Sequence, residues 1–278
     1  MRFAPPIVAV LFAVMSVGGP AAAGDGASGD TRILGDRFCI GLSDGIVDLD
    51  TAVAAGRGLG AIIGLEDILG FDDEISSFGI SGFWRFTKSG RQTLKVRYGN
   101  FNRSAETVVD GTVPILDVEF YGRLESSFIN EVGSLEYQYS LVNNGTTEAG
   151  ISGGIATYKY DLTISGEAII DNNPEHSEFR SQSVGVVAPV PAFGFFINQA
   201  LRKNLILQVS TSFIDLTIGE HNGRIFNTLG ALSWFFNRHF GLGLGLSTSD
   251  VFYEHDGDRK LRVELRQNAV DLRLSVVF

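Results

Sequence analysis

The chain has 278 residues, of which 44% are hydrophobic and only 19% are charged, a composition that excludes a largely disordered protein. Its 22 Lys and Arg residues against 32 Asp and Glu residues give a net charge of −10. We therefore predict no nucleic-acid partner, because such binding needs a basic surface. The single cysteine, Cys39, excludes an internal disulfide and any cysteine-rich zinc site.

The first residues match a secretory signal peptide. Arg2 gives a positive start, 7–17 is an uncharged apolar run, and 21–23 is an Ala-Ala-Ala cleavage pattern. The run is too short for a membrane-spanning helix, which needs about 20 apolar residues; an uncleaved anchor is the alternative. We predict a cleaved signal peptide over residues 1–23 and an N-terminal periplasmic segment over 24–36.

Alternating apolar and polar residues predict ten strands in the rest of the chain. A period of two places successive side chains on opposite faces of a strand. The clearest case begins at Phe240, where Leu242 and Leu244 alternate with glycines. In chain order, the ten predicted strands cover 37–47, 76–87, 91–103, 123–142, 147–165, 183–198, 204–217, 224–236, 240–254 and a last strand that ends at 278.

The connections between these strands alternate in length. Four are short, at 88–90, 143–146, 202–204 and 237–239, and three of the others are long, at 48–75, 104–122 and 166–182. Three strands also change phase: in 204–217, for example, the apolar set shifts to Ile214, Leu216 and Ile218. Either bulges occur there or these strands extend beyond a membrane.

The last strand has one apolar face, which consists of Val270, Leu272, Leu274, Val276 and Phe278. The residues between them are mostly small, polar or charged. An apolar face with a terminal aromatic resembles the closing strand of bacterial outer-membrane β-barrels, in which it serves as the assembly signal.

Over nearly all of 37–278 the chain resembles Gram-negative outer-membrane β-barrel proteins as a class. The resemblance implies an all-β fold: a closed antiparallel transmembrane β-barrel of about 10 strands, with short periplasmic turns and longer extracellular loops. It also implies contact with outer-membrane lipid and lipopolysaccharide, and with the outer-membrane assembly machinery through the C-terminal strand.

Alternation alone does not separate such a barrel from a soluble sandwich. The aromatic residues favour the barrel, because they gather near the short turns, as in the aromatic girdle of a membrane protein. They are Trp84, Phe86, Tyr137, Tyr139, Trp234, Phe236 and Phe240.

A barrel of ten strands allows at most a narrow channel. Mixed charged and polar side chains are predicted to face its lumen: Arg85, Lys95, Arg97, Glu136, Gln138, Asp271 and Arg273. We predict that they pair and plug the barrel, because buried charges need partners; a selectivity filter is the alternative.

The sequence Ala188-Pro189-Val190-Pro191 lies inside a predicted strand. Proline has no N–H, so two ladder hydrogen bonds would be missing on one side of the strand. Pro189 and Pro191 therefore mark a candidate lateral seam for an apolar molecule, with a simple kink for curvature as the alternative.

The predicted function is a non-enzymatic narrow channel or lateral-transfer route for a small or apolar solute, with no cofactor and no metal. The loop segment 64–74 is acidic and could attract a divalent cation, but it lacks the spacing of a calcium loop and is predicted to be a solvated rim. Within it, Leu65, Ile68 and Leu69 are predicted to cover the barrel mouth, and the wider segment 59–70 could hide a short strand or helix.

Besides the channel or lateral-transfer route, two function classes remain open: an outer-membrane enzyme, either a protease or a lipid-modifying enzyme, and a structural or adhesive barrel. A protease resembling the ten-stranded omptins would need acidic residues and a His-Asp pair together, for which Asp72, Asp73, His255 and Asp256 are the nearest equivalents. A lipid-modifying enzyme would need a Ser-His pair, but Ser247 and Ser249 lie too far from His255 along one strand. A structural or adhesive surface barrel is the third class, and no residue pattern marks a partner site for it.

Overall fold

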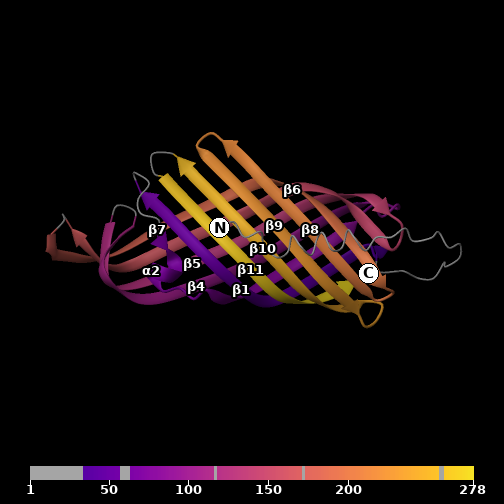
Figure 1. The fold of residues 1–278 in the computed structure, drawn as a ribbon, viewed down its shortest axis with the longest axis horizontal. Helices are drawn as coiled ribbons and strands as arrows, with labels where there is room; N and C mark the ends of the chain where they lie inside the picture. The colour runs from indigo at the N-terminus through magenta and orange to yellow at the C-terminus, as the bar shows by residue number, and fades with distance from the viewer. Residues whose placement is uncertain (1–33, 57–62, 116–117, 171–172, 257–259) are drawn as a thin grey trace, which may run out of the picture.

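The structure, a computed structural model, describes residues 34–56, 63–115, 118–170, 173–256 and 260–278. Within these residues ten long strands form a closed ring, in which β11 pairs with β1 and every other strand pairs antiparallel with its neighbours in sequence (Figure 1). The prediction of a ten-stranded antiparallel ring is therefore confirmed. The strands are β1 (Phe38–Gly56), β3 (Glu74–Arg85), β4 (Gln92–Ile115), β5 (Val118–Asn143), β6 (Thr147–Ile170), β7 (Asn173–Arg202), β8 (Leu205–Ile218), β9 (His221–Phe235), β10 (Phe240–Asp256) and β11 (Lys260–Val277).

The described part of the connection between β1 and β3 contains two small elements. These are the two-residue strand β2 (Ile63–Gly64) and the helix α2 (Leu65–Leu69), which packs on β1 and β4. The expectation of a short element here is confirmed. Among the described residues, no helix has both the length and the apolar character needed to cross a membrane.

The four predicted short turns are confirmed, and they lie at the same end of the barrel as the first and last strand residues. There the backbone N–H of Phe38 donates to the carbonyl of Phe278 at 3.1 Å, and the N–H of Phe278 donates to the carbonyl of Phe38 at 2.9 Å. These bonds join the two ends of the sheet. The signal peptide predicted over 1–23 lies outside the described residues, as does most of the segment predicted over 24–36.

The prediction of long loops is wrong for 104–122 and 166–182, which are largely strand because β4 and β5, and β6 and β7, continue as tall hairpins. In 48–75, β1 runs on to Gly56, but its ladder with β3 ends at Asp48↔Glu74, and β2 and α2 lie in the connection. The polar residues that resembled loops are the outward face of these extensions. In 166–182, for example, exposed Glu167 on β6 lies between buried Gly166 and Ala168.

The phase changes are explained by this extension rather than by bulges. The β8–β9 register runs without a shift from Leu205↔Trp234 to Ile218↔His221, yet exposed Phe213 is followed by buried Ile214 and exposed Asp215. The faces therefore keep their orientation while the residue types exchange. We call the part with the short turns the lower half and the part beyond this exchange the upper half; on β6 the halves are 147–155 and 157–170.

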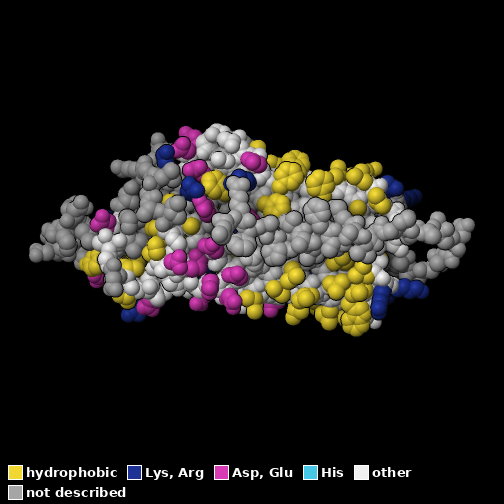
Figure 2. Space-filling view, in the orientation of Figure 1, with side chains coloured by type: hydrophobic (Ala, Val, Ile, Leu, Met, Phe, Trp, Pro, Cys, Tyr) yellow, Lys and Arg dark blue, Asp and Glu magenta, His cyan; other side chains and the backbone are white. Residues whose placement is uncertain are grey.

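The lower half has an apolar outer surface (yellow, on the right in Figure 2), whereas Asp and Glu side chains gather over the upper half. On β11 the predicted apolar face is outward: Leu272 is 69% exposed and Phe278 is 61% exposed. The predicted girdle residues are all exposed near the short turns, and several touch, as Trp84 and Phe86 do with ring centroids 5.7 Å apart. An exposed apolar belt of this size marks a surface that faces something other than water.

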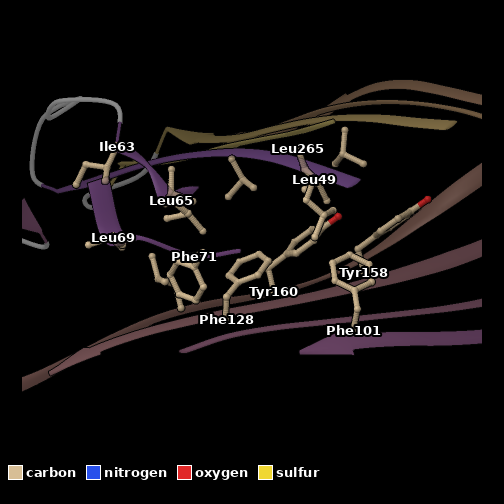
Figure 3. Close-up of a cluster of buried hydrophobic side chains, with 14 of the residues drawn as sticks. Leu49, Ile63, Leu65, Leu69, Phe71, Phe101, Phe128, Tyr158, Tyr160 and Leu265 are labelled. Atoms are coloured by element: carbon tan, nitrogen blue, oxygen red, sulfur yellow. The ribbon is translucent and has the colours of Figure 1, made fainter. Parts of the chain in front are cut away.

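The upper half has the opposite arrangement, with a dry apolar interior. Its side chains point toward one another from β1, β4, β5, β6, β11 and α2 (Figure 3). Leu65, Ile68 and Leu69 were predicted to cover the barrel mouth. In the structure, α2 lies against the upper interior, with Leu65 and Leu69 fully buried in the apolar cluster and Ile68 exposed.

Candidate functional site

The candidate site is the interior of the barrel, which has a floor, a cavity, a roof and a lateral gap. The cavity has a volume of about 370 Å³. Serine hydroxyls from many strands line it, together with Lys95, Arg97, Glu136, Asp271 and Arg273. Polar lining inside an apolar belt is the arrangement expected of a transmembrane barrel.

The floor is built around Arg85 and Glu148, both almost completely buried. Arg85 Nη2 donates to Glu148 Oε2 at 2.6 Å, and Arg85 Nη1 donates to the carbonyl of Asp36 at 2.8 Å. Ser140 Oγ and Asn198 Nδ2 also donate to the Glu148 carboxylate, at 2.7 Å and 3.1 Å. Sequence reasoning placed Arg85 in the lumen but missed Glu148, although alternation from Gly150 and Ser152 would have turned it inward.

An apolar cluster occupies the same end of the barrel. Leu34, which lies before β1, is buried with Ile206, Phe235 and Val277. The short segment before β1 thus contributes a buried side chain to the closure of the lower half.

Two of the predicted lumen groups form a tight pair on one wall. Arg273 donates through Nη2 to Asp271 Oδ2 at 2.9 Å and through Nε to Asp271 Oδ1. Gly245 makes room for this pair, because a Cβ there would overlap Asp271 Oδ2 and lie 2.7 Å from Arg273 Nε. Asp271 is therefore fully engaged by one cation.

The other predicted lumen groups are less completely paired. Gln138 Nε2 donates to Glu136 Oε1 at 2.5 Å, and Glu136 lies opposite Lys95 in the β4–β5 register. Within the described residues, neither Lys95 nor Arg97 has a carboxylate oxygen within 4.0 Å, since the ion pairs found there involve other cations. The predicted paired plug is thus a set of partial pairs around a cavity.

Aromatic side chains form the roof of the cavity. Phe128, Tyr160 and Tyr158 stack nearly parallel, with centroid separations of 6.1 Å and 6.3 Å. Phe101 lies beside them in the same cluster (Figure 3). All four residues are buried, and Phe101, Tyr158 and Tyr160 line the cavity where it meets the apolar upper interior.

Above the roof, Arg103 fastens α2 to the wall. Arg103 Nη1 donates to Glu66 Oε1 at 2.5 Å and Nη2 donates to Thr51 Oγ1 at 2.6 Å. Its guanidinium also lies 5.1 Å from the ring centroid of Phe71 and 5.2 Å from that of Phe128. This corrects one part of the rim prediction, because Glu66 is a structural partner, whereas Asp67, Asp72 and Asp73 are exposed.

The two prolines lie beside a gap between β7 and β8. β7 pairs with β6 from Asn173 to Gln199, with Pro189 opposite Thr157 and Pro191 opposite Ile155. Its ladder with β8, in contrast, runs only from Arg202 to Phe193, which pairs with Phe213. β8 continues for five residues beyond that point, to Ile218, without pairing to β7.

The orientation of the backbone explains where this ladder stops. The N–H of Ala200 donates to the carbonyl of Thr146, on the β6 side, at 2.8 Å. Because N–H groups alternate between the two neighbours of a strand, the nitrogens of Pro189 and Pro191 are turned toward β8. Both positions lack the hydrogen that a β7–β8 ladder would need.

The residues proposed for an enzymatic rim site are not brought together. The carbonyl of Asp73 accepts a hydrogen bond from the N–H of Leu49, on β1. His255 pairs with Leu261 of β11, which in turn pairs with Ala55 of β1, so His255 lies at the level of Ala55. Six residues along β1 separate these levels, which is roughly 20 Å at about 3.4 Å per residue. Asp256 forms an ion pair with Lys260 at 2.5 Å.

No group of three or more His, Cys, Asp or Glu side chains within the described ranges is arranged to hold a metal ion.

Several solved structures resemble this barrel, whereas no protein-family model and no curated protein sequence matches the chain. The outer membrane protease OmpT from Escherichia coli matches 87% of this chain and 97% of its own, with a TM-score of 0.59 and 11% identity. The outer membrane protein OprG from Pseudomonas aeruginosa matches 86% and 95%, with a TM-score of 0.33 and 11% identity. The toluene transporter TodX from Pseudomonas putida matches 90% and 93%, with a TM-score of 0.35 and 8% identity. Of these three, the OmpT similarity is close enough to bear on the fold, and at that identity it bears on nothing else.

The fold, the apolar belt and the polar lumen define the class of this protein. The chain has the fold of Gram-negative outer-membrane β-barrel proteins, and its lower half has the apolar outer surface and polar interior that a membrane-spanning barrel needs.

Proposed function

We propose that this barrel is non-enzymatic and that it transfers small apolar molecules sideways, between the outer leaflet of the membrane and the interior of its upper half. The route is the gap between β7 and β8. The observation that carries the proposal is the end of the β7–β8 ladder at Phe193↔Phe213, where Pro189 and Pro191 face the unpaired side.

The gap begins at the upper edge of the lipid-facing belt. On β6, exposed Ile155 lies opposite Pro191, and two positions beyond Thr157 the outward face carries Lys159. On β8, exposed Phe213 is followed by exposed Asp215. A molecule dissolved in the outer leaflet would therefore meet the gap at the depth of the membrane interface.

The surfaces on both sides of the gap are apolar. Outside, Val187 is 62% exposed and Phe193 is 59% exposed. Inside, Ile214 is buried, and Val190 and Ala192 pack against the apolar cluster of the upper half. An apolar solute could move between these surfaces without passing a charged group. Covering a charged group with an apolar solute would remove its contact with water, which is unfavourable.

Transport along the barrel axis has less support than lateral transfer. The buried Arg85–Glu148 pair and the Leu34 cluster occupy the lower end, and the aromatic roof and α2 occupy the upper half. We accordingly expect no steady single-channel steps from the refolded protein in a planar bilayer. Regular steps would contradict this part of the proposal.

The seam is tested by restoring the two missing donors. In bacteria that express the barrel, the variant Pro189→Ala with Pro191→Ala is expected to slow uptake of the apolar dye N-phenylnaphthylamine several-fold, to near the rate of cells without the barrel. Ile151→Ala, an exposed outward residue of β6 in the lower half, is the matched control and should leave uptake unchanged. Unchanged uptake in the double variant, with folding verified by heat-modifiable gel mobility, would contradict the lateral route.

A further inference from the structure

The polar cavity below the aromatic roof, which we call the lower cavity, has more basic than acidic side chains in its lining. Lys95, Arg97 and Arg273 all line it, and Glu136 and Asp271 are the acidic groups that line it among the residues the structure describes. Asp271 is bound by two hydrogen bonds from Arg273, so it offers little to the other cations. Lys95 and Arg97 are left with one carboxylate between them.

That remaining carboxylate does not complete a direct ion pair. Glu136 interacts electrostatically with both Arg97 and Lys95, and it accepts hydrogen bonds from Gln138 and Ser152. Neither cation reaches it within 4.0 Å, to judge from the ion pairs of the described residues. Lys95, Arg97 and Arg273 also repel one another. With all three basic groups protonated, one positive charge in this cavity has no carboxylate counterion among the described residues.

An uncompensated charge inside a barrel that crosses lipid is unfavourable unless the group loses its proton or a bound ion balances it. We propose that the lower cavity binds a small oxyanion, a carboxylate or a phosphate, between Lys95 and Arg97. The planar fork of an arginine suits two oxygens of such an anion, and the lysine adds a second charge.

Hydroxyl donors surround the same place. In the strand register, Ser81 of β3 and Ser134 of β5 lie directly beside Arg97 on its two sides, and all three residues line the cavity. Serine hydroxyls can donate to the remaining oxygens of an oxyanion. The cavity volume of about 370 Å³ accommodates an ion of this size together with water.

This inference is independent of the lateral route, because it concerns the polar cavity below the aromatic roof. Its test uses the full-length barrel, refolded into detergent micelles in the presence of radiolabelled inorganic phosphate or radiolabelled acetate. Equilibrium dialysis then measures the anion bound per folded barrel. We expect saturable binding of about one anion per barrel for at least one of the two, and the two arms distinguish phosphate from carboxylate chemistry.

Three variants test where the anion lies. Arg97→Gln should weaken binding about 10- to 100-fold, as expected for the loss of a charge-assisted hydrogen bond. Glu136→Gln should strengthen binding, because it removes the one competing carboxylate, and a merely structural role for Glu136 would not have that effect. Lys159→Gln, on the outer face of the upper half and paired with Glu131, is the matched control and should change nothing.

Two results would overturn the proposal. The first is the absence of saturable binding of both anions to the folded native barrel. The second is binding that Arg97→Gln and Lys159→Gln weaken equally, because this would locate the anion on the surface. Folding of every variant is verified by heat-modifiable gel mobility, so a variant that fails to fold is replaced by Lys95→Gln, for which the same loss is expected.

Discussion

The lower and upper halves of this barrel use the same strands in opposite ways. In the lower half the outward face is apolar and the interior is polar, with Ile155 outside and Ser152 inside on β6. In the upper half of the same strand Lys159 and Asp161 are outside while Tyr160 and Leu162 are buried. The direction of the side chains does not change, so the exchange of residue types records the edge of the lipid layer.

The comparison also explains how each half is stabilised. The upper half has a core like that of a soluble β-barrel, and the hydrophobic effect acts on it directly. The lower half gains little from interior apolar packing, and its floor relies on buried polar contacts such as Arg85 with Glu148. Substitutions should therefore have effects that depend on the half in which they lie.

The largest effect is expected in the core of the upper half. Phe128→Ala removes a ring that is 1% exposed and should reduce the free energy of unfolding by about 3–5 kcal/mol. Phe179→Ala, on the outward face of the same half and 68% exposed, should change it by no more than about 0.5 kcal/mol. Urea unfolding in lipid vesicles measures both, and equal losses would contradict a dry upper interior.

The next effect tests the lipid-facing surface of the lower half. Leu272→Arg places a charge on the exposed apolar face of β11 and should cost about 2–4 kcal/mol if the residue faces the middle of the bilayer. Thr163→Arg, which faces outward on β6 in the upper half, should be tolerated within about 0.5 kcal/mol. If both variants fold into vesicles with native stability, the belt does not contact lipid.

A smaller effect is expected where α2 is fastened. Glu66→Gln removes the charged partner of Arg103, whose side chain is 2% exposed, and should cost about 1.5–3 kcal/mol. The exposed neighbour Asp67 gives the control, Asp67→Asn, for which no change is expected. Native stability of the Glu66→Gln variant would show that the helix is held by its leucines alone.

The smallest effect concerns a buried phenol of the upper half. Burial raises the pKa of Tyr160 well above its ordinary value, and its hydroxyl has no hydrogen-bond partner among the described residues. Because the folded state favours the neutral phenol, this contribution to stability is complete below pH about 10 and is lost as the pH rises through the raised pKa.

Tyr160→Phe should leave stability unchanged or slightly higher at pH 8. It should also reduce the loss of stability between pH 8 and pH 11, as measured by urea unfolding. An identical loss in the native protein and in Tyr160→Phe would show that the phenol does not contribute.

Sequence periodicity was enough to predict the ring of ten strands, the short turns and the outward face of β11 from Val270 to Phe278. It failed for the tall hairpins in 104–122 and 166–182, because an outward face that includes Ser104, Glu106 and Glu167 resembles a loop when lipid is assumed on that side. The buried partners Glu148 and Glu66 were missed for another reason. Their pairing depends on cross-strand register and on the place of α2, which composition does not encode.

The central claim, that the outward face changes from lipid to water along a single strand, can be measured directly. In a Cys39→Ser background, nitroxide labels at Ile151, Ile155, Lys159 and Thr163 on β6 would be compared in lipid vesicles by electron paramagnetic resonance. We predict that molecular oxygen relaxes the labels at Ile151 and Ile155 more strongly, and that a water-soluble nickel complex relaxes those at Lys159 and Thr163 more strongly. Four labels that are all accessible to the nickel complex would contradict the account.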